Sequence, residues 1–535
     1  MARSAALRGN LDRVVDRICT AWLIVMAATP LALAADREPS SRVRFEVTLD
    51  SEVASEPIDG RLYLFLSQRG GQPMRGPDWF RPEPFFRLDV QRFKTGESRI
   101  IDNRAAGFPG RIDQLPAGRY RAQAVLDHDF YDPKPADGAV NFYSEVVEIE
   151  VGDKSSDAQF ADADPDKKAA DTGKTFTLRL AKTIKNVAFP ESQWVKEIAL
   201  SSRLLELFHK REVVERAAVV LPASYYDEKE RRYPTVYIIP GFGGSHRDGL
   251  RYVAAPPKPE PEETEFIRVY LSGRCKWGHH VYADSATNGP RGETLVREMI
   301  PHIEREFRTV AEPTARFVMG HSSGGWSSLW LQVTYPDLFG GVWSSSPDPV
   351  DFRNYQGINL YADPPQNMYR EEKGGRRPIA RRGETPSLWY DEFTKMDDVL
   401  GRGGQLRSFE AVFSPLDEAG LPKQLWDRQS GQIDPAVAEA WEKYDISLIL
   451  ERDWPRLKPR LAGKLHVTMG TLDTFYLDGA TRMLAERLKE LGSDAQITFV
   501  EGASHGSLLT PAYSSRVRRE MSATYRKHHG DRDAR

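Results

Sequence analysis

The most constraining feature of the chain is a serine-containing turn between two apolar segments. The turn has the form Gly-x-Ser-x-Gly over residues 320–324, follows the apolar residues 315–319 and precedes the apolar residues 326–335. Small residues two positions on either side of a serine allow a strand to turn sharply into a helix, with the serine held in a strained conformation above the sheet edge. The turn therefore predicts a strand, a nucleophilic Ser322 at the positive end of a helix dipole, and a helix.

A serine hydroxyl needs a base, normally a histidine that is oriented by a carboxylate. On a strand–turn–helix of this kind the partners follow in the order serine, acid, histidine, on loops after later strands. Of the four histidines after Ser322, His505 follows the predicted strand 496–500 in a loop of small residues, so we predict that it is the base. For the acid we predict Asp473, which directly follows the predicted strand 465–469. The competing Asp478 opens the next helix and is typical of a first-turn charge.

Acyl transfer also needs backbone N–H donors aimed at the developing oxyanion. Residues 240–244 (PGFGG) follow the predicted strand 235–239, and their glycines allow the main chain to approach a substrate closely. We expect the amides of Ser323 and Phe242, or that of Gly243, to form an oxyanion hole. This loop matches neither the dinucleotide-binding nor the P-loop pattern, so we expect no nucleotide cofactor.

The second half of the chain alternates short, nearly continuous apolar segments with amphipathic ones. This pattern predicts an α/β domain over residues 195–525, with a doubly wound, mostly parallel sheet covered on both faces. Residues 348–458 interrupt the pattern with a polar, Arg/Gly-containing stretch. An insertion of this length in an α/β domain is usually functional or disordered, and we interpret it as a lid.

The first half has a different period. Val43, Phe45, Val47 and Leu49 alternate with polar residues, and similar alternating segments recur up to about residue 182. A period of two with Pro/Gly/Asp-rich connections predicts an antiparallel, immunoglobulin-like β-sandwich over residues 40–182.

Residues 1–35 resemble a cleavable export signal. Four arginines precede an apolar run that ends in small residues around Ala34, as a signal peptidase requires. The alternative is a retained membrane anchor, because the run is nearly long enough to span a bilayer. We expect cleavage, no stable membrane insertion afterwards, and a bacterial periplasmic or secreted protein.

Composition excludes several other classes. Of 535 residues, 40% are hydrophobic and 28% are charged, which is typical of two or three globular domains. The net charge of −3 gives no global basic field for nucleic acid. Two cysteines are too few for a disulfide framework, and we expect Cys275 to pack as a small apolar residue.

Other aromatic and histidine clusters leave alternatives open. The segment with His279, His280, Tyr282 and Asp284 could bind a metal, but no third ligand is evident, and a substrate-facing loop that includes Trp277 is favoured. We expect no metal. Trp326, just inside the nucleophile helix, could equally line an acyl pocket or pack against the sheet.

Three motifs resemble a known family. They are LPASYY at residues 221–226, YPTVYIIPGFGG at residues 233–244 and GHSSGG at residues 320–325. Together they look like the putative-esterase (esterase D-like) branch of the α/β-hydrolases, which includes feruloyl and other carbohydrate esterases, enterochelin esterases and mycolyltransferases. The resemblance covers about residues 213–345 and 463–508 and implies metal-free serine hydrolysis or transfer of an acyl ester. It also supports Ser322, Asp473 and His505 as a triad. Many relatives carry histidine where this chain has Pro240.

The favoured hypothesis is an exported serine esterase acting on a small-molecule or carbohydrate ester. A serine peptidase or acyltransferase would use the same triad, and a catalytically inactive binding protein is the third possibility. The polar character of the insertion argues against a lipase, whose lid would present an apolar face.

Overall fold

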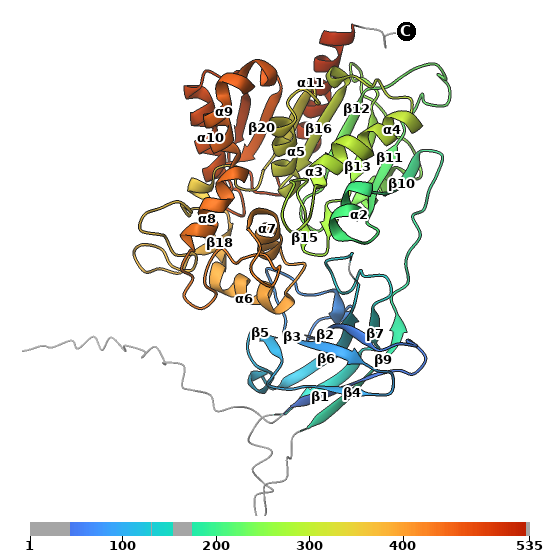
Figure 1. Cartoon of the computed structure of the whole chain (residues 1–535), viewed down its shortest axis with the longest axis vertical. Coiled ribbons are helices and arrows are strands. Elements are labelled where there is room, and N and C mark those ends of the chain that lie inside the picture. The colour runs from blue at the N-terminus through green and yellow to red at the C-terminus, as the bar shows by residue number, and fades with distance from the viewer. Residues whose placement is uncertain (1–42, 130, 153–173, 531–535) are drawn as a thin grey trace, which may run out of the picture. The chain divides into compact units, whose positions relative to one another are not determined.

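A computed structural model describes residues 43–129, 131–152 and 174–530 of the chain. The predicted export signal, residues 1–35, lies outside these described residues. The described residues fall within one compact unit, and Figure 1 shows its two sheets. In the described ranges no helix is long and apolar enough to cross a membrane.

Nine strands form the N-terminal sheet. Their order is β4-β1-β9-β7-β6-β2-β3-β5, with β8 also paired to β6. The bounds are β1 (Arg44–Leu49), β2 (Ile58–Ser67), β3 (Phe85–Phe93), β4 (Ser98–Ile101), β5 (Ala106–Phe108), β6 (Gly118–Asp127), β7 (Phe142–Ser144), β8 (Val147–Val151) and β9 (Thr175–Thr183). The alternation expected in β1 is present: Phe45, Val47 and Leu49 are fully buried and the residues between them are half-buried.

The strand pairing differs from the antiparallel sandwich that the sequence predicted. All nine strands are hydrogen-bonded into one sheet, and β1 runs parallel to β9, with Phe45 opposite Phe176. Side-chain alternation reports which face a residue occupies, but it carries no information on the direction of the neighbouring strand. Both faces of β2 are used. Leu64 faces the sheet's own core, whereas Tyr63 belongs to the core of the C-terminal region.

Eight strands form the second sheet, in the order β10-β11-β13-β12-β16-β17-β20-β21. They are β10 (Val195–Ser201), β11 (Val214–Val220), β12 (Thr235–Ile239), β13 (Ile267–Leu271), β16 (Arg316–His321), β17 (Gly341–Ser345), β20 (Leu465–Gly470) and β21 (Gln496–Val500). β10, β11 and β13 pair antiparallel, and every other pair is parallel. The chain winds outward from β12 to β13 on one side and from β16 to β21 on the other. The reversal between β12 and β16 is where open α/β sheets bind ligands.

Helices cover both faces of this sheet (Figure 1). Their bounds are α2 (Arg203–His209), α3 (Arg291–Thr294), α4 (Ile300–Glu306), α5 (Ser323–Thr334), α10 (Asp478–Glu490) and α11 (Pro511–His529). On one face, Tyr513 and Val517 of α11 pack with Phe317 and Trp343. On the other face, α5 packs with helices of the insertion.

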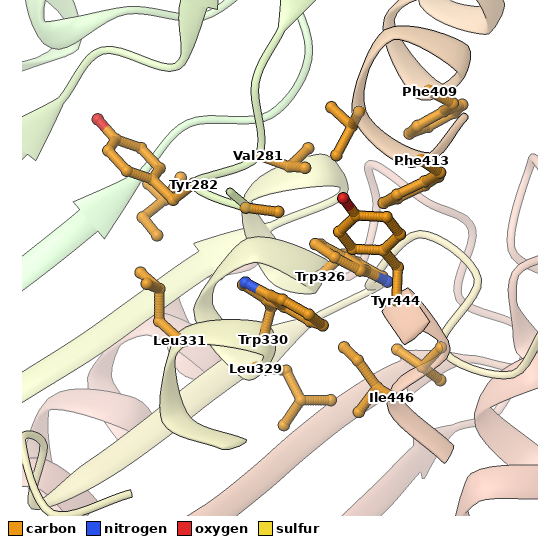
Figure 2. Packing of buried hydrophobic residues seen from close by; sticks show 14 of the residues in the cluster. Val281, Tyr282, Trp326, Leu329, Trp330, Leu331, Phe409, Phe413, Tyr444 and Ile446 are labelled. Atoms are coloured by element: carbon orange, nitrogen blue, oxygen red, sulfur yellow. The ribbon is translucent and has the colours of Figure 1, made fainter. Parts of the chain in front are cut away.

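The insertion is folded and has an apolar inner side. It contains the hairpin β18 (Pro378–Arg382) and β19 (Thr385–Trp389), and the helices α6 (Tyr390–Leu400), α7 (Gln405–Phe413), α8 (Pro435–Trp441) and α9 (Ile446–Leu461). Figure 2 shows aromatic residues of the insertion against α5. Phe413 lies 5.2 Å from Trp326 and Tyr444 lies 5.6 Å from Trp330, measured between ring centroids. The polar composition of the insertion therefore describes only its outer side.

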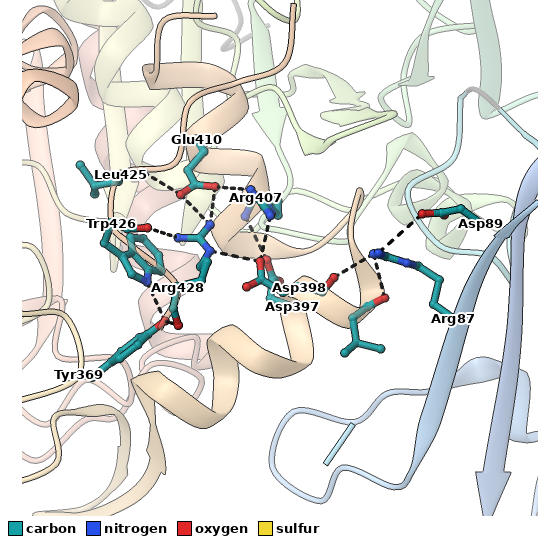
Figure 3. Close-up of polar contacts among 11 residues, drawn as sticks. Arg87, Asp89, Tyr369, Asp397, Asp398, Arg407, Glu410, Leu425, Trp426 and Arg428 are labelled. Atoms are coloured by element: carbon teal, nitrogen blue, oxygen red, sulfur yellow. Dashed lines mark hydrogen bonds and ion pairs between the residues drawn. The ribbon is translucent and has the colours of Figure 1, made fainter. Parts of the chain in front are cut away.

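Buried and half-buried charged side chains fix the insertion internally and to the first sheet (Figure 3). Glu410, which is fully buried, accepts from Arg428 at 2.7 and 2.8 Å and from Arg407 at 3.2 Å. Arg87 of β3 donates to the Asp398 carbonyl oxygen at 3.0 Å. A buried carboxylate is tolerated only when it is paired and hydrogen-bonded, so these arginines have a structural role.

Candidate active site

Ser322 occupies a sharp turn between β16 and α5. Its backbone has φ 61° and ψ −127°, a region that a residue with a side chain adopts only under strain. Glycines on both sides allow this turn. A Cβ atom on Gly320 would lie 2.1 Å from the Gly324 carbonyl oxygen, and one on Gly324 would lie 2.1 Å from that of Ile239. The Gly-x-Ser-x-Gly pattern thus forms the predicted strand–turn–helix.

Asp473 and His505 are brought together by neighbouring parallel strands. Asp473 follows β20 and His505 follows β21, and Asp473 Oδ2 lies 2.7 Å from His505 Nδ1. Asp473 is fully buried, and its Oδ1 accepts from the Phe475 amide at 2.9 Å. Because a carboxylate can only accept, Nδ1 carries the proton and Nε2 is left as the ring's acceptor.

The competing carboxylate, Asp478, is engaged elsewhere. It begins α10 and its Oδ1 accepts from Arg381 at 2.6 Å. Arg381 also donates to the Asp473 carbonyl oxygen at 2.8 Å. Asp478 therefore has the helix-terminal position expected for it and is bound to an arginine.

The loop after β12 approaches Ser322 closely. A Cβ atom on Gly241 would lie 3.3 Å from that of Ser322. Gly241 and Phe242 line the same cavity as Ser322 and His505, whereas Gly243 does not. Instead, the Gly243 carbonyl oxygen accepts from Arg274 at 2.9 Å. Of the two residues expected to supply the second oxyanion donor, Phe242 is the better placed.

His279 fixes this loop through a hydrogen bond to its first residue, Pro240. Its Nδ1 accepts from the Val281 amide at 2.9 Å, so Nε2 carries the proton and donates to the Pro240 carbonyl oxygen at 3.0 Å. Burial lowers the pKa of His279 to about 4, which keeps the ring neutral. His279 and His280 are buried, so the expectation of a substrate-facing loop is wrong for these two residues. Within the described residues there is no group of three metal-ligating side chains.

A cavity of about 270 Å³ opens beside Ser322 and His505. Most of its wall is apolar and much of it comes from the insertion. The apolar lining residues are Trp79, Phe242, Pro349, Ile379, Leu388, Phe393, Leu406, Phe409, Phe475 and Leu477. The insertion thus contributes an apolar face to the site, which its polar composition did not suggest.

Trp79 was missed at the level of sequence. It lies in the loop before β3 of the first sheet, and its ring is 5.2 Å from Phe393 and 5.7 Å from Phe242. One sequence feature could have pointed to Trp79: it is adjacent to a second aromatic residue, Phe80, in a loop rich in glycine and proline. Large aromatic residues in such a loop are not expected to belong to a core, so a role in binding could have been considered. The N-terminal sheet region therefore supplies part of the cavity wall.

Neither tryptophan predicted to bind substrate lines this cavity. Trp326 is 1% exposed and stacks on Trp330 with ring centroids 5.2 Å apart, so its packing alternative is the one observed. Trp277 is half-buried and lines a different cavity. Cys275 is buried, as expected for a small apolar residue.

A second carboxylate, Asp348, lines the cavity and was also missed. It follows β17, is 5% exposed, and its backbone amide donates to the Ser322 carbonyl oxygen at 3.3 Å. Its Oδ2 has no hydrogen-bond partner among the described residues. Burial raises the pKa of Asp348 to about 6, while the Ser323 hydroxyl and His505 act in the opposite direction.

Comparisons with known proteins agree with this arrangement. Residues 280–507 match the family described as "Putative esterase", so the resemblance is confirmed over this range. Two curated relatives from strains of Mycobacterium tuberculosis, Esterase MT1326 and Esterase Rv1288, are each 31% identical over 152 residues, which is 27% of this chain. The chain spans about a third (31%) of the length of these relatives.

Two solved enzyme structures align with more than half of this chain. A ferulic acid esterase aligns with 62% of this chain and 98% of its own at 14% identity and a TM-score of 0.39. An S-formylglutathione hydrolase from Agrobacterium tumefaciens aligns with 64% of this chain and 98% of its own at 14% identity and a TM-score of 0.38. The mixed sheet and the family match together identify an α/β-hydrolase fold.

Proposed function

We propose that the protein is a serine hydrolase that cleaves carboxylic esters through an acyl-enzyme on Ser322. The observation that carries this proposal is the 2.7 Å contact of Asp473 with His505, which lines the same cavity as the strained Ser322. Nε2 of His505 accepts the Ser322 proton as Oγ attacks the ester carbonyl, and Asp473 stabilises the imidazolium that forms. The Ser323 and Phe242 amides donate to the oxyanion.

The second half of the reaction repeats these steps with water. His505 returns its proton to the leaving alcohol, then accepts a proton from water as the hydroxyl attacks the acyl carbonyl, and finally protonates Ser322 Oγ. No metal is needed, because the proton transfers and the oxyanion contacts are supplied by the chain itself. The same residues would serve a transferase if an alcohol replaced water.

The cavity favours a compact aromatic acyl group. At about 270 Å³ it is at or below the lower limit of pockets for drug-sized ligands, and a long acyl chain does not fit within it. Trp79, Phe393 and Phe475 offer aromatic faces and edges to a ring. Gln405 offers hydrogen bonds to a ring hydroxyl, whereas Gln356 already donates to the Phe475 carbonyl oxygen and accepts from the Tyr390 hydroxyl.

Two measurements test the proposal. Ser322→Ala should lower kcat on a short-chain aryl ester by several orders of magnitude without changing the melting temperature. Ser328→Ala, on the helix α5 that follows Ser322, is the matched control and should keep its turnover. In wild type, kcat/KM on a methyl hydroxycinnamate should exceed that on a palmitoyl ester. Normal turnover by Ser322→Ala would overturn the nucleophile, whereas a preference for palmitate would overturn only the substrate class.

We also propose that the protein is exported and that its first 35 or so residues are removed. The support is the arginine-rich start, the apolar run and the small residues near Ala34. N-terminal sequencing of protein purified from a bacterial periplasm tests this. A mature chain that begins near Asp36 is expected, and an intact N-terminus in the membrane fraction would favour the anchor instead.

A further inference from the structure

A second cavity, of about 660 Å³, is lined by the later residues of the loop whose first residues line the catalytic cavity. Gly241 and Phe242 belong to the catalytic cavity, and Ser245, His246 and Arg247 belong to the second one. The proposed reaction uses none of the second cavity's side chains. Its volume is in the range of pockets that bind small molecules.

The charge of this second cavity is predominantly positive. Six arginine and lysine side chains line it, against four carboxylates. The Arg211 guanidinium donates to the Glu212 carbonyl oxygen at 3.2 Å and that of Arg247 donates to the Val187 carbonyl oxygen. Neither charge is therefore neutralised by a carboxylate within the described part of the chain. The pKa of Lys276 is lowered, first by burial and then by the positive charges of Arg402, Arg61 and Arg211. The second cause is consistent with a positive local field in the cavity.

Buried polar atoms without partners also line the cavity. Asn288 is 2% exposed, yet its Nδ2 has no acceptor among the described residues, and neither has Nε of Arg274. His246 donates through Nε2 to Glu197 at 2.9 Å, so its unpartnered Nδ1 is an acceptor. A buried donor or acceptor that is left unpaired destabilises the fold, so these atoms point to a ligand that pairs with them.

Trp277 completes the site. It is half-buried in the wall of this cavity, with the Lys276 ammonium 5.9 Å from its ring centroid. A large aromatic face beside unpaired donors and acceptors can contact the apolar face of a ring whose edges carry polar groups. The residue singled out in the sequence as substrate-facing thus belongs to this site.

We propose that the second cavity binds a small hydroxylated carboxylate with the chemistry of a sugar acid. Its carboxylate would be attracted by Arg211 and Arg247 and would accept from Asn288. Its hydroxyls would donate to His246 Nδ1, and its ring would lie against Trp277. Binding does not require hydrolysis, so the proposal stands or falls separately from the proposed esterase activity.

Calorimetric titration of the full-length Ser322→Ala protein tests the site. The probes are galacturonic acid, its neutral counterpart galactose, and inorganic phosphate. We expect galacturonic acid to bind at least about 10-fold more tightly than either, because only it supplies both the charge and the hydroxyls. Equal affinity for galactose, equal affinity for phosphate, or no binding of galacturonic acid at millimolar concentration would overturn the proposal.

Variants locate the binding. Asn288→Asp keeps the side-chain shape but replaces the donor with a negative charge, so affinity for galacturonic acid should fall at least about 10-fold. Arg247→Gln should weaken it several-fold. Arg203→Gln, an exposed arginine on α2 that does not line the cavity, is the matched control. If Asn288→Asp fails to fold, the affinity of Arg247→Gln for galacturonic acid tests the assignment instead. An affinity equal to that of Arg203→Gln would overturn it.

Discussion

Replacing Asp348 with asparagine should stabilise the protein at neutral and alkaline pH but much less in acid. Asp348 is buried beside Ser322, and burial raises its pKa to about 6 from an ordinary value of 3.8. A carboxyl group whose pKa is raised on folding binds its proton more tightly in the native state. Its ionisation therefore destabilises the fold, and stability is lost as the pH rises through about 6. Asparagine removes this loss.

The magnitude follows from the two pKa values. The difference between 3.8 and about 6, at ~1.36 kcal/mol per pH unit, gives roughly 3 kcal/mol for complete ionisation. At about pH 4.5 the unfolded carboxyl is already mostly ionised and about 1 kcal/mol of the effect is present, so the change between about pH 4.5 and about pH 8 is roughly 2 kcal/mol. If residues 195–530 unfold together, their unfolding entropy is about 0.7 kcal/mol/K, and the melting temperature should shift by roughly 3 °C.

Differential scanning calorimetry of wild type and Asp348→Asn at these two pH values measures the effect. The gain in melting temperature should be larger at the higher pH by roughly 3 °C. Glu418→Gln, which changes an exposed carboxylate of the same insertion, controls for the change in net charge. A gain that is equal at both pH values, or a loss of stability at the higher one, would show that Asp348 is satisfied in the folded state.

Three further substitutions separate the roles around the triad. Asp473→Asn should stay folded and lose about 10⁴-fold in kcat, because the imidazole loses its orienting partner. Asp478→Asn should keep its turnover, and because burial raises the pKa of Asp478 despite its ion pair with Arg381, its stability should change by less than about 1 kcal/mol. Steady-state kinetics and melting curves check both, and the reverse result would reassign the acid. Gly324→Ala places a Cβ atom 2.1 Å from the Ile239 carbonyl oxygen and should lower kcat/KM at least about 10²-fold, whereas an active variant would show that the turn can relax.

The parts of the site that could be predicted from sequence are those with a local signature. The turn around Ser322 is encoded by two glycines and the segments beside it. Asp473 and His505 are far apart in sequence, but each directly follows an apolar strand. Because the carboxyl ends of neighbouring parallel strands meet at one edge of a sheet, strand order alone brings these side chains together.

The cavity wall could not be predicted in this way, since it depends on packing between distant segments. Trp79 reaches the site from a loop of the first sheet, and its local sequence does not predict that its ring contacts Phe393. The apolar face of α7 was present as Leu406, Phe409 and Phe413, at helical spacing, but it was masked by the polar composition of the insertion. The parallel pairing of β1 with β9 could not be predicted for a different reason: side-chain alternation does not encode the direction of the neighbouring strand.

A serine-directed fluorophosphonate tests the central claim most directly. The reagent forms a covalent adduct only with a serine that a neighbouring base activates, so it reports the nucleophile without knowledge of the natural substrate. Peptide mass spectrometry of the labelled protein should find a single adduct on Ser322, and Ser322→Ala should remain unlabelled. An adduct on any other serine, or an unlabelled wild-type protein that is folded, would contradict the assignment of this site as a serine-hydrolase centre.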